Sequence, residues 1–465
     1  MAGRRLLVVG GDAAGMTAAS HVRRAVADAA VTVVERGPHT SYSMCGIPFL
    51  VGGLIDTADD LVVRRPDEFA AAGITVHTRT EARSVDAAAR TVRVRDLDGG
   101  RERDEPYDAL LYAAGAHPVV PPVPGVQRYA AVVHTLDEGD RLRSLLDAEQ
   151  PQVRSVVVVG AGYIGLELAE ALVRRGLDTT LVDRGDQVMP SLDADMAAPV
   201  ETALRGFGVR VALGETLTEV VGDEQGCRHV VTDAGTHVAD LVVIAVGASP
   251  NVAVARSAGC ALGPSGALEV DAAMRTSVEC IWAAGDCVES TNVVSGRPVN
   301  VQLGTHANKQ GKIAGLHLAA ALGAAPAPAE ALFPGLVGTA VTKVCDTEVA
   351  RTGVNEREAA AAGIDYAAVR FTGTARAGYM PDPGDVTVKM LAEVGTGRVL
   401  GAQLVGTGNV GKRIDTAATW CQLGVTVQRA QLLDLAYAPP FGGVWDLLAV
   451  AARKLVRRLD LSPQL

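Results

Sequence analysis

One cysteine, Cys45, lies in the stretch TSYSMCGIPFLVGG of residues 40–53, downstream of a glycine-rich turn that ends at Gly15. A loop of small residues precedes it and an apolar, helix-like run follows it. The N–H dipoles at a helix N-terminus favour the thiolate, which is the nucleophilic form of cysteine. Most lone cysteines are buried and inert, and this stretch alone favours that outcome. Because the rest of the chain builds two dinucleotide-binding sites, we expect Cys45 to be a redox-active thiol with a lowered pKa.

The elements before Cys45 have the order of a dinucleotide-binding unit. A strand at 5–9 precedes GGDAAG, a helix-like run at 16–30 follows, and a strand at 31–34 ends on Glu35. Such glycines let the backbone approach a pyrophosphate, helix N–H groups donate to it, and the acid accepts from ribose hydroxyls. Asp12 stands where GxGxxG has its second glycine, so we interpret this turn as a degenerate fingerprint.

A second glycine turn has the complete fingerprint. In SVVVVGAGYIGLELAEAL, Gly160, Gly162 and Gly165 follow a valine-rich strand and open a helix. The next strand, TTLVD, ends on Asp183. Two such sites predict one resident and one exchanging dinucleotide. Asp183 favours the free 2′-hydroxyl of NADH, whereas the adjacent Arg184 suits the 2′-phosphate of NADPH, so both nucleotides remain open.

The composition is typical of a multidomain α/β enzyme. The chain has 465 residues, of which 48% are hydrophobic and 51 are glycines, and this length predicts several domains. A net charge of -10 argues against nucleic-acid binding, and no apolar run reaches the roughly 18 residues of a membrane span. The cysteines lack CxxC spacing, so we expect neither disulfides nor a metal site, and a cytoplasmic location.

From end to end, the chain resembles the FAD-dependent pyridine nucleotide-disulfide oxidoreductases. The motifs GGDAAG, AAGAHP, GAGYIGLELAE, AVGASPN and AAGDC occur in that order, before a strand-rich C-terminal segment that ends in helices. The resemblance implies an α/β fold like that of glutathione reductase, with two Rossmann-like dinucleotide-binding domains and an α+β C-terminal dimerisation domain. The expected domains are an FAD domain at 1–118 and 252–325, an NAD(P)H domain at 119–251, and an interface domain at 326–465.

The resemblance also implies roles for residues of these motifs. The first glycine turn and Glu35 would hold the adenosine half of FAD, and Asp286 would accept from its ribityl chain. Tyr163 would cover the flavin when no nucleotide is bound, and Glu167 would lie near the nicotinamide. The full set expected to bind FAD and NADH or NADPH is Gly10, Gly11, Ala14, Gly15, Glu35, Arg36, Ala82, Ala114, Gly115, Gly160, Gly162, Tyr163, Ile164, Gly165, Glu167, Asp183, Gly247 and Asp286.

Within this family, the chain is similar to the subgroup with a single redox cysteine. The CxxxxC pair of two-cysteine reductases is missing, because Leu50 stands five residues after Cys45, and the C-terminal histidine base is missing, because His317 is the last histidine. Coenzyme A-disulfide reductases, persulfide reductases, and NADH oxidases and peroxidases share the single cysteine. The oxidases and peroxidases usually place a histidine where this chain has Ala13.

The resemblance implies a homodimer that reduces a low-molecular-weight disulfide or persulfide. Tyr379 and Tyr437, in GYMPDP and AYAPPF, would reach the partner's thiol and act as catalytic acids, or they would only pack at the interface. Arg23 and Arg24 would meet coenzyme A phosphates or form a solvated helix face, and the basic residue expected near Gly73 is missing. Two alternatives remain open: an NADH oxidase or peroxidase that cycles a cysteine sulfenic acid, and a thiol-independent, ferredoxin-type reductase.

Overall fold

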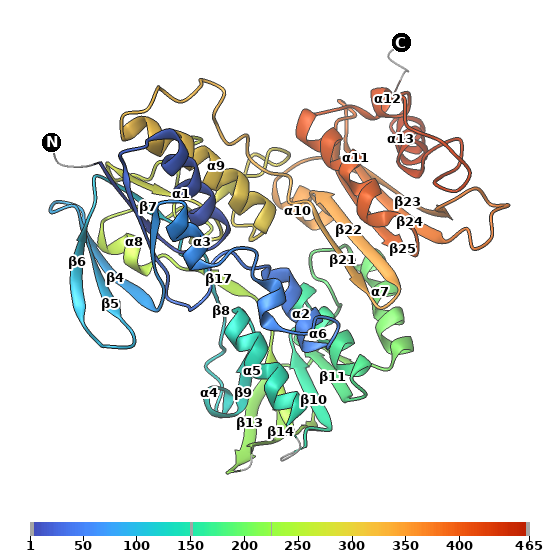
Figure 1. Cartoon of the computed structure of the whole chain (residues 1–465). Coiled ribbons are helices and arrows are strands. Elements are labelled where there is room, and N and C mark those ends of the chain that lie inside the picture. Colours follow the sequence, from blue (N-terminus) through green and yellow to red (C-terminus); the bar gives the residue numbers. More distant parts are fainter. Residues whose placement is uncertain (1–3, 149–151, 225, 462–465) are drawn as a thin grey trace.

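The computed structural model describes residues 4–148, 152–224 and 226–461. The predicted domain ends at 1–3 and 462–465 lie outside the described residues. Figure 1 shows three lobes: the N-terminal lobe at the upper left, the middle lobe below it, and the C-terminal lobe at the upper right.

The first lobe contains a parallel sheet of buried, apolar strands. Its order is β18-β7-β1-β2-β3, with bounds Ile281–Ala283, Ala109–Tyr112, Arg5–Val9, Ala30–Val34 and Ile74–His77. Strands that are apolar on both sides need a cover on each face of the sheet. One cover is the helix pair α1 (Ala13–Ala25) and α9 (Gly304–Ala321), and the other is an antiparallel sheet of β4 (Thr80–Asp86), β5 (Thr91–Asp96) and β6 (Glu102–Pro106).

The second lobe repeats this plan. Its parallel sheet has the order β12-β11-β10-β16-β9, with bounds Arg210–Leu213, Asp178–Asp183, Ser155–Val159, Leu241–Ile244 and Ala130–Val132. Its helices are α4 (Val126–Tyr129), α5 (Leu136–Asp147), α6 (Tyr163–Arg174) and α7 (Ala194–Phe207). A small antiparallel sheet contains β13 (Leu217–Asp223), β14 (Gly226–Thr232) and β15 (Thr236–Val238).

The third lobe is an antiparallel sheet with helices. The strand order is β21-β22-β25-β24-β23, with bounds Ala340–Val344, Thr347–Gly353, Val399–Gly406, Asp385–Glu393 and Tyr366–Thr374. The helices are α10 (Glu356–Ala361), α11 (Val410–Leu423), α12 (Val427–Ala430) and α13 (Leu447–Arg458).

Short elements connect the lobes. The two chain crossings between the first and second lobes pair as β8 (Ala116–Pro118) and β17 (Ala248–Pro250). The other short elements are η2 (Ala58–Leu61), α3 (Pro66–Ala71), α8 (Ala253–Ser257), β19 (Ser290–Thr291) and β20 (Pro298–Val299).

The first helix differs from its sequence prediction at both ends. We expected residues 16–30, whereas α1 begins at Ala13 inside the glycine turn and ends at Ala25. The C-terminal shift arises because the Ala30 N–H donates to Arg4 O at 2.8 Å, which places Ala30 in strand β2.

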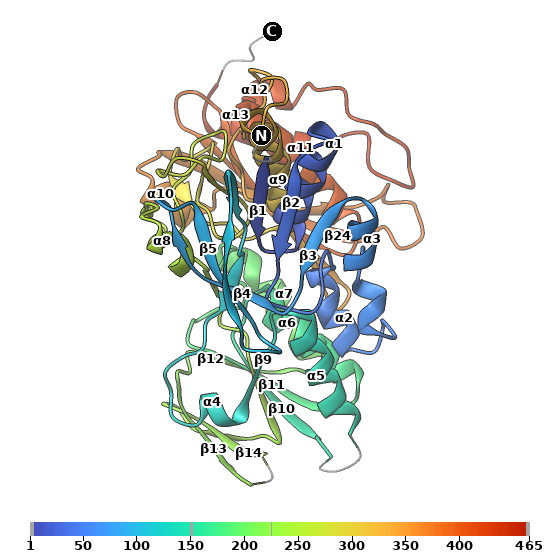
Figure 2. The ribbon, with the colours of Figure 1, turned by 60° about the vertical axis from the view of Figure 1, so that its left-hand side comes forward.

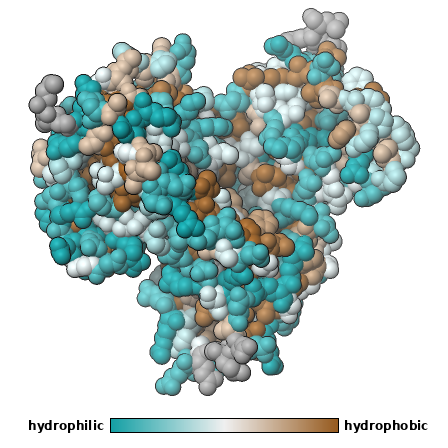
Figure 3. Space-filling model, viewed as in Figure 1, coloured by the Kyte–Doolittle hydropathy of each residue, from teal (hydrophilic) through white to brown (hydrophobic). Residues whose placement is uncertain are grey.

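The segment around Cys45 lies where the three lobes meet. It forms η1 (Met44–Gly46) and α2 (Ile47–Val51). Leu50 belongs to the same hydrophobic core as Leu166 of α6 and Val349 of β22, and α2 packs directly against α5 and α6. Figure 2 shows α2 beside α5 and α6, between the two parallel sheets. In Figure 3, apolar side chains gather at this central part of the surface.

Candidate active site at the junction of the lobes

Cys45 is positioned by tight packing of the backbone around it. The Ser43 N–H donates to Leu61 O at 2.8 Å, and the Gly46 N–H donates to Ser43 O at 2.9 Å. A Cβ on Gly46 would lie 2.2 Å from Leu61 Cδ2, so a larger residue here would have to displace the buried Leu61 side chain of η2. The cysteine itself is exposed in the single chain, which leaves its sulfur open to a substrate.

The electrostatic surroundings of Cys45 correct one sequence prediction. We expected a lowered pKa from a helix N-terminus, but partial burial and then the charges of Glu167 and Asp286 raise the pKa of the Cys45 thiol. The helix that follows, α2, is a single short turn, whose dipole is small because few peptide units align in it. Burial, followed by two nearby carboxylates, therefore raises the pKa of a thiol that the sequence pattern predicted to be acidic.

The first glycine turn is tight, and its helix end is open. A Cβ on Gly10 would lie 2.1 Å from Ala113 O, and one on Gly15 would lie 1.9 Å from Gly10 O. Glu35 accepts from the Gly11 N–H and the Gly37 N–H, both at 2.7 Å. The Asp12 carboxyl interacts with the Ala13 N–H, but no side-chain hydrogen bond caps the N-terminus of α1, so the N–H groups that follow Ala13 are available to an anion.

Two further carboxyl groups converge on this turn. Burial, followed by the charge of Glu35, raises the pKa of Asp12 to about 6. Burial also raises the pKa of Asp286, which follows β18, to about 6. Asp286 in turn raises the pKa of Asp12, which shows that the two groups face the same region. A ligand whose hydroxyl groups donate hydrogen bonds would stabilise the ionised forms of these carboxyl groups.

The second glycine turn has the same construction. A Cβ on Gly160 would lie 2.3 Å from Ala245 O, and one on Gly165 would lie 1.8 Å from Gly160 O. Asp183 accepts from the Ala161 N–H and the Gly185 N–H, both at 2.7 Å, as Glu35 does at the first turn. Again no side chain caps the helix, α6. Both turns thus fit the pyrophosphate and ribose of a dinucleotide.

The start of α6 carries three further predicted site residues, Tyr163, Ile164 and Glu167. The Tyr163 hydroxyl is buried without a hydrogen-bond partner among the described residues. Glu167 accepts from the Thr342 hydroxyl of β21 at 2.6 Å, and burial raises the pKa of Glu167. Ile164 between them is 44% exposed. Helix α6, which begins at the second turn, is therefore in direct contact with the C-terminal lobe, which the sequence did not indicate.

The remaining predicted cofactor residues lie in α1, in β4 and in the loops that follow parallel strands. Ala14 lies in α1 and contacts the region of Gly285, and Ala82 lies in β4. Arg36 follows Glu35 and lies 3.8 Å from Glu81. Ala114 O accepts from Asn251 Nδ2 at 2.8 Å. Two glycines after parallel strands have positive φ, namely Gly115 (63°) and Gly247 (104°).

The two predicted catalytic tyrosines lie together on the C-terminal lobe. Tyr379 is 76% exposed and Tyr437 is 47% exposed. Burial and the adjacent Tyr437 hydroxyl raise the pKa of Tyr379. Among the described residues, no hydrogen bond joins either tyrosine to Cys45 within one chain. Their participation thus remains a prediction that requires a second subunit.

The acids of the first turn predict a pH-dependent stability of the apoprotein. Because the folded-state pKa of Asp286 is about 6 and an unfolded aspartate titrates near pH 4, the folded state binds more protons between these values. The contribution of protonated Asp286 to the free energy of unfolding is therefore present at low pH and is lost as the pH rises through about 6. Asp286→Asn should stabilise the apoprotein at pH 7 by up to about 2–3 kcal/mol, and the gain should vanish near pH 4.

The measurement is thermal unfolding of FAD-free protein across this pH range. Asp28→Asn is the matched control, because Asp28 is 76% exposed. If Asp286→Asn raises the stability of the apoprotein equally at pH 4 and pH 7, the raised pKa of Asp286 is contradicted.

In the part of the chain that the structure describes, every helix is too short or too polar to span a bilayer. Within the same ranges, no group of three or more histidine, cysteine or acidic side chains is arranged to hold a metal ion.

Comparisons with known proteins agree with this geometry. A family model described as pyridine nucleotide-disulphide oxidoreductase matches residues 4–311, and the dimerisation-domain model of that family matches 339–448. The chain is 38% identical to an NAD(P)H coenzyme A polysulfide/persulfide reductase of Pyrococcus horikoshii, over 97% of this chain and 98% of that protein. It is 33% identical to an NADH oxidase of Methanocaldococcus jannaschii, over 98% and 99% of the two chains. A solved NAD-dependent persulfide reductase from A. fulgidus superposes with a TM-score of 0.92 at 38% identity, over 98% of this chain and 83% of that one.

Proposed function

Because the chain belongs to the pyridine nucleotide-disulphide oxidoreductases, we propose that it passes electrons from NADH or NADPH through FAD to a low-molecular-weight disulfide or persulfide, with Cys45 as the redox thiol. The observation that carries the proposal is the position of Cys45 between the two dinucleotide turns. Glu167 follows the second turn and Asp286 flanks the first, and both charges act on this one thiol.

The proposed reaction is a thiol–disulfide exchange followed by reduction. The Cys45 thiolate attacks one sulfur of the substrate disulfide, the other sulfur leaves as a thiolate, and Cys45 is left in a mixed disulfide. FAD, when bound, supplies the electron pair that the nicotinamide donates. Reduction of the mixed disulfide would release the second thiol and return Cys45 to the thiolate, so that overall one disulfide, one NADH and one proton would give two thiols and NAD⁺.

Proton supply to the leaving thiolate is the proposed role of the two C-terminal tyrosines. The matched dimerisation domain indicates a homodimer. We propose that Tyr379 and Tyr437 reach the partner's Cys45, because both are exposed and adjacent on the interface lobe. A phenol that donates to the departing sulfur prevents the reverse attack.

The carboxylates of the two turns are the proposed ribose ligands. Glu35 would bind the FAD ribose and Asp183 the nicotinamide dinucleotide, because each already orients the N–H of its own glycine turn. Asp183 would repel a 2′-phosphate, which favours NADH. A higher kcat/KM for NADPH than for NADH would instead assign the dominant role to Arg184, which is exposed beside it.

Basic side chains on α1 and α9 support an anionic substrate such as a coenzyme A disulfide. Burial, followed by the charges of Arg24 and Lys312, lowers the pKa of His21. At Gly73, where the sequence lacks the expected basic residue, a Cβ would lie 2.5 Å from Arg23 Nε. The Arg23 guanidinium thus provides a positive charge at that place.

The NADH oxidase alternative is supported by the relative of that name at 33% identity. In that reaction Cys45 would cycle through a sulfenic acid. All seven cysteines are free, which supports the predicted cytoplasmic location for either activity.

An anaerobic titration of the purified flavoprotein with NADH tests the proposal. If Cys45 is a second redox centre, the oxidised enzyme should accept one electron pair beyond the pair that reduces the flavin. If enzyme that was pre-incubated with disulfide takes up only the electron pair that reduces the flavin, no thiol lies on the electron path.

A further inference from the structure

Residues 189–195 follow β11, include the first two residues of α7, and contact the second glycine turn on one side. The Met189 N–H donates to Ala161 O, inside that turn, at 2.8 Å. Met189 is fully buried with φ of 47°, a left-handed conformation that a non-glycine residue adopts only when its surroundings impose it. The position of the turn and the conformation of this segment are therefore coupled.

The same segment supports Tyr163. The Ser191 side chain faces the Tyr163 hydroxyl closely enough to lower its pKa, although burial has the larger effect and raises it. Neither hydroxyl makes a full hydrogen bond among the described residues. Tyr163 is thus held by the shape of its surroundings rather than by a bond of its own.

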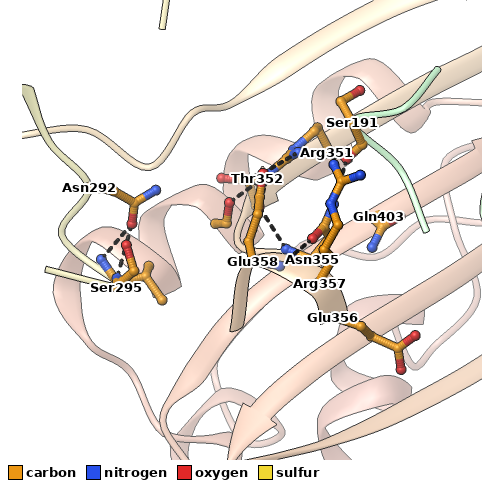
Figure 4. Close-up of polar contacts among 12 residues, drawn as sticks. Ser191, Asn292, Ser295, Arg351, Thr352, Asn355, Glu356, Arg357, Glu358 and Gln403 are labelled. Atoms are coloured by element: carbon orange, nitrogen blue, oxygen red, sulfur yellow. Dashed lines mark hydrogen bonds and ion pairs between the residues drawn. The ribbon is translucent and has the colours of Figure 1, made fainter. Parts of the chain in front are cut away.

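On its other side, the segment is fastened to the C-terminal lobe. Arg351 Nη1 donates to Ser191 O at 2.6 Å, and Asn355 Nδ2 donates to the same oxygen at 3.1 Å. Glu358 orients the guanidinium of Arg351 at 2.7 Å. Figure 4 shows Arg351 beside Ser191, with Asn355 and Glu358 next to it.

A second fastening lies at the end of the segment. The Asp193 N–H donates to Gln403 Oε1 at 2.8 Å, and Gln403 Nε2 returns a bond to Asp193 Oδ2 at 2.6 Å. Lys389 Nζ lies 3.1 Å from the same carboxylate and also binds Asp195 and Glu356. Asp193, Gln403 and Lys389 are all buried. A buried and fully paired network of this kind has one favourable arrangement and resists rotation.

We propose that residues 189–195 are a strut through which the C-terminal lobe positions Tyr163 and the second glycine turn, so that Arg351 and Gln403 are positioning residues for hydride transfer. The inference rests on the proposed function, because it takes the second turn as the nicotinamide site. In this arrangement the second lobe does not rotate to admit the nucleotide. Only the Tyr163 side chain moves, while the strut keeps the turn at a constant distance from Cys45 and the first lobe.

Arg351→Lys tests the strut while retaining the charge beside Glu358. A lysine lacks the planar fork that reaches Ser191 O, Gly353 O and Glu358 together. In the FAD-free protein, hydrogen exchange at the Met189 amide should rise about tenfold, because its acceptor turn and its own segment both gain freedom. In the holoenzyme, the anaerobic rate of flavin reduction by NADH should fall about tenfold, with the Kd for NADH changed less than about threefold.

Three further variants keep the test decisive. Ser191→Ala removes the hydroxyl but keeps the main-chain acceptor, so Met189 exchange should stay at the parent rate. Arg458→Lys is the matched charge control, because Arg458 donates to Ala368 O within the C-terminal lobe. Gln403→Leu removes both hydrogen bonds between Gln403 and Asp193 without touching Arg351, and should reproduce the effect if Arg351→Lys does not fold.

Unchanged Met189 exchange in both Arg351→Lys and Gln403→Leu would overturn the proposal, as would a loss of NADH affinity with an unchanged rate of flavin reduction. Neither readout uses Cys45. Failure of the thiol chemistry in the titration would therefore leave this test intact, and failure of this test would leave the thiol chemistry intact.

Discussion

Replacing Cys45 with serine should lower turnover of disulfide or persulfide substrates by about a thousandfold or more. A serine hydroxyl is almost wholly protonated at neutral pH, and it cannot form a mixed disulfide. FAD content should be unchanged, because neither glycine turn contains this residue. Anaerobic flavin reduction by NADH should also persist. The measurements are steady-state disulfide reduction and stopped-flow flavin reduction on the same preparation.

Cys280→Ser is the matched control for this result. Cys280 is the one other cysteine that is not buried, so it represents incidental loss of an accessible thiol. Reduction of a dye or quinone, which takes electrons directly from the flavin, should survive in both variants. Undiminished disulfide turnover in Cys45→Ser would reject the thiol mechanism and favour the thiol-independent electron-transfer reductase.

Gly162→Ala should lower kcat/KM for NADH on the order of a hundredfold while leaving FAD binding and stability unchanged. A Cβ at Gly162 meets nothing within 4 Å and the residue has φ of -81°, so the protein alone accepts alanine. Only a pyrophosphate that lies against the bare backbone would meet the added methyl, and a small misplacement of the nicotinamide is costly. Kinetics with NADH and thermal unfolding measure the two effects separately.

Gly165→Ala provides the contrast within the same turn. Its Cβ would lie 1.8 Å from Gly160 O, so we expect this variant to lose stability whether or not nucleotide is present. If Gly162→Ala instead uses NADH as well as the parent does, the second turn does not carry the nucleotide in the proposed way.

Much of the fold was predictable because it depends on local patterns. Buried runs such as Leu6–Val9 and the valines of β10 predicted parallel strands, and the glycine turns predicted where helices follow them. The spacing to Glu35 and Asp183 predicted carboxylates at the turns, and both accept an N–H there. The two Rossmann-like sheets and the antiparallel C-terminal sheet confirm the predicted fold class.

The prediction for the Cys45 pKa was wrong because its causes are not local. The sequence shows the short helix that follows Cys45, whereas the burial of the thiol and then its proximity to Glu167 and Asp286 arise only when the lobes have assembled. The same holds for the contact between Glu167 and Thr342. Asp12 could be noticed as a departure from the fingerprint, but its raised pKa depends on burial beside Glu35.

The discontinuous first lobe has a consequence for synthesis on the ribosome. Chains emerge N-terminus first and domains tend to fold as they emerge. The last strand of the second sheet, β16, ends at Ile244, whereas the first sheet needs β18, Ile281–Ala283, to pair with β7. The first lobe thus begins to emerge before the second lobe, but its sheet can be completed only after the sheet of the second lobe. Asp286 follows β18 directly. It therefore joins Asp12 and Glu35 at the first turn only after all strands of the second sheet have emerged.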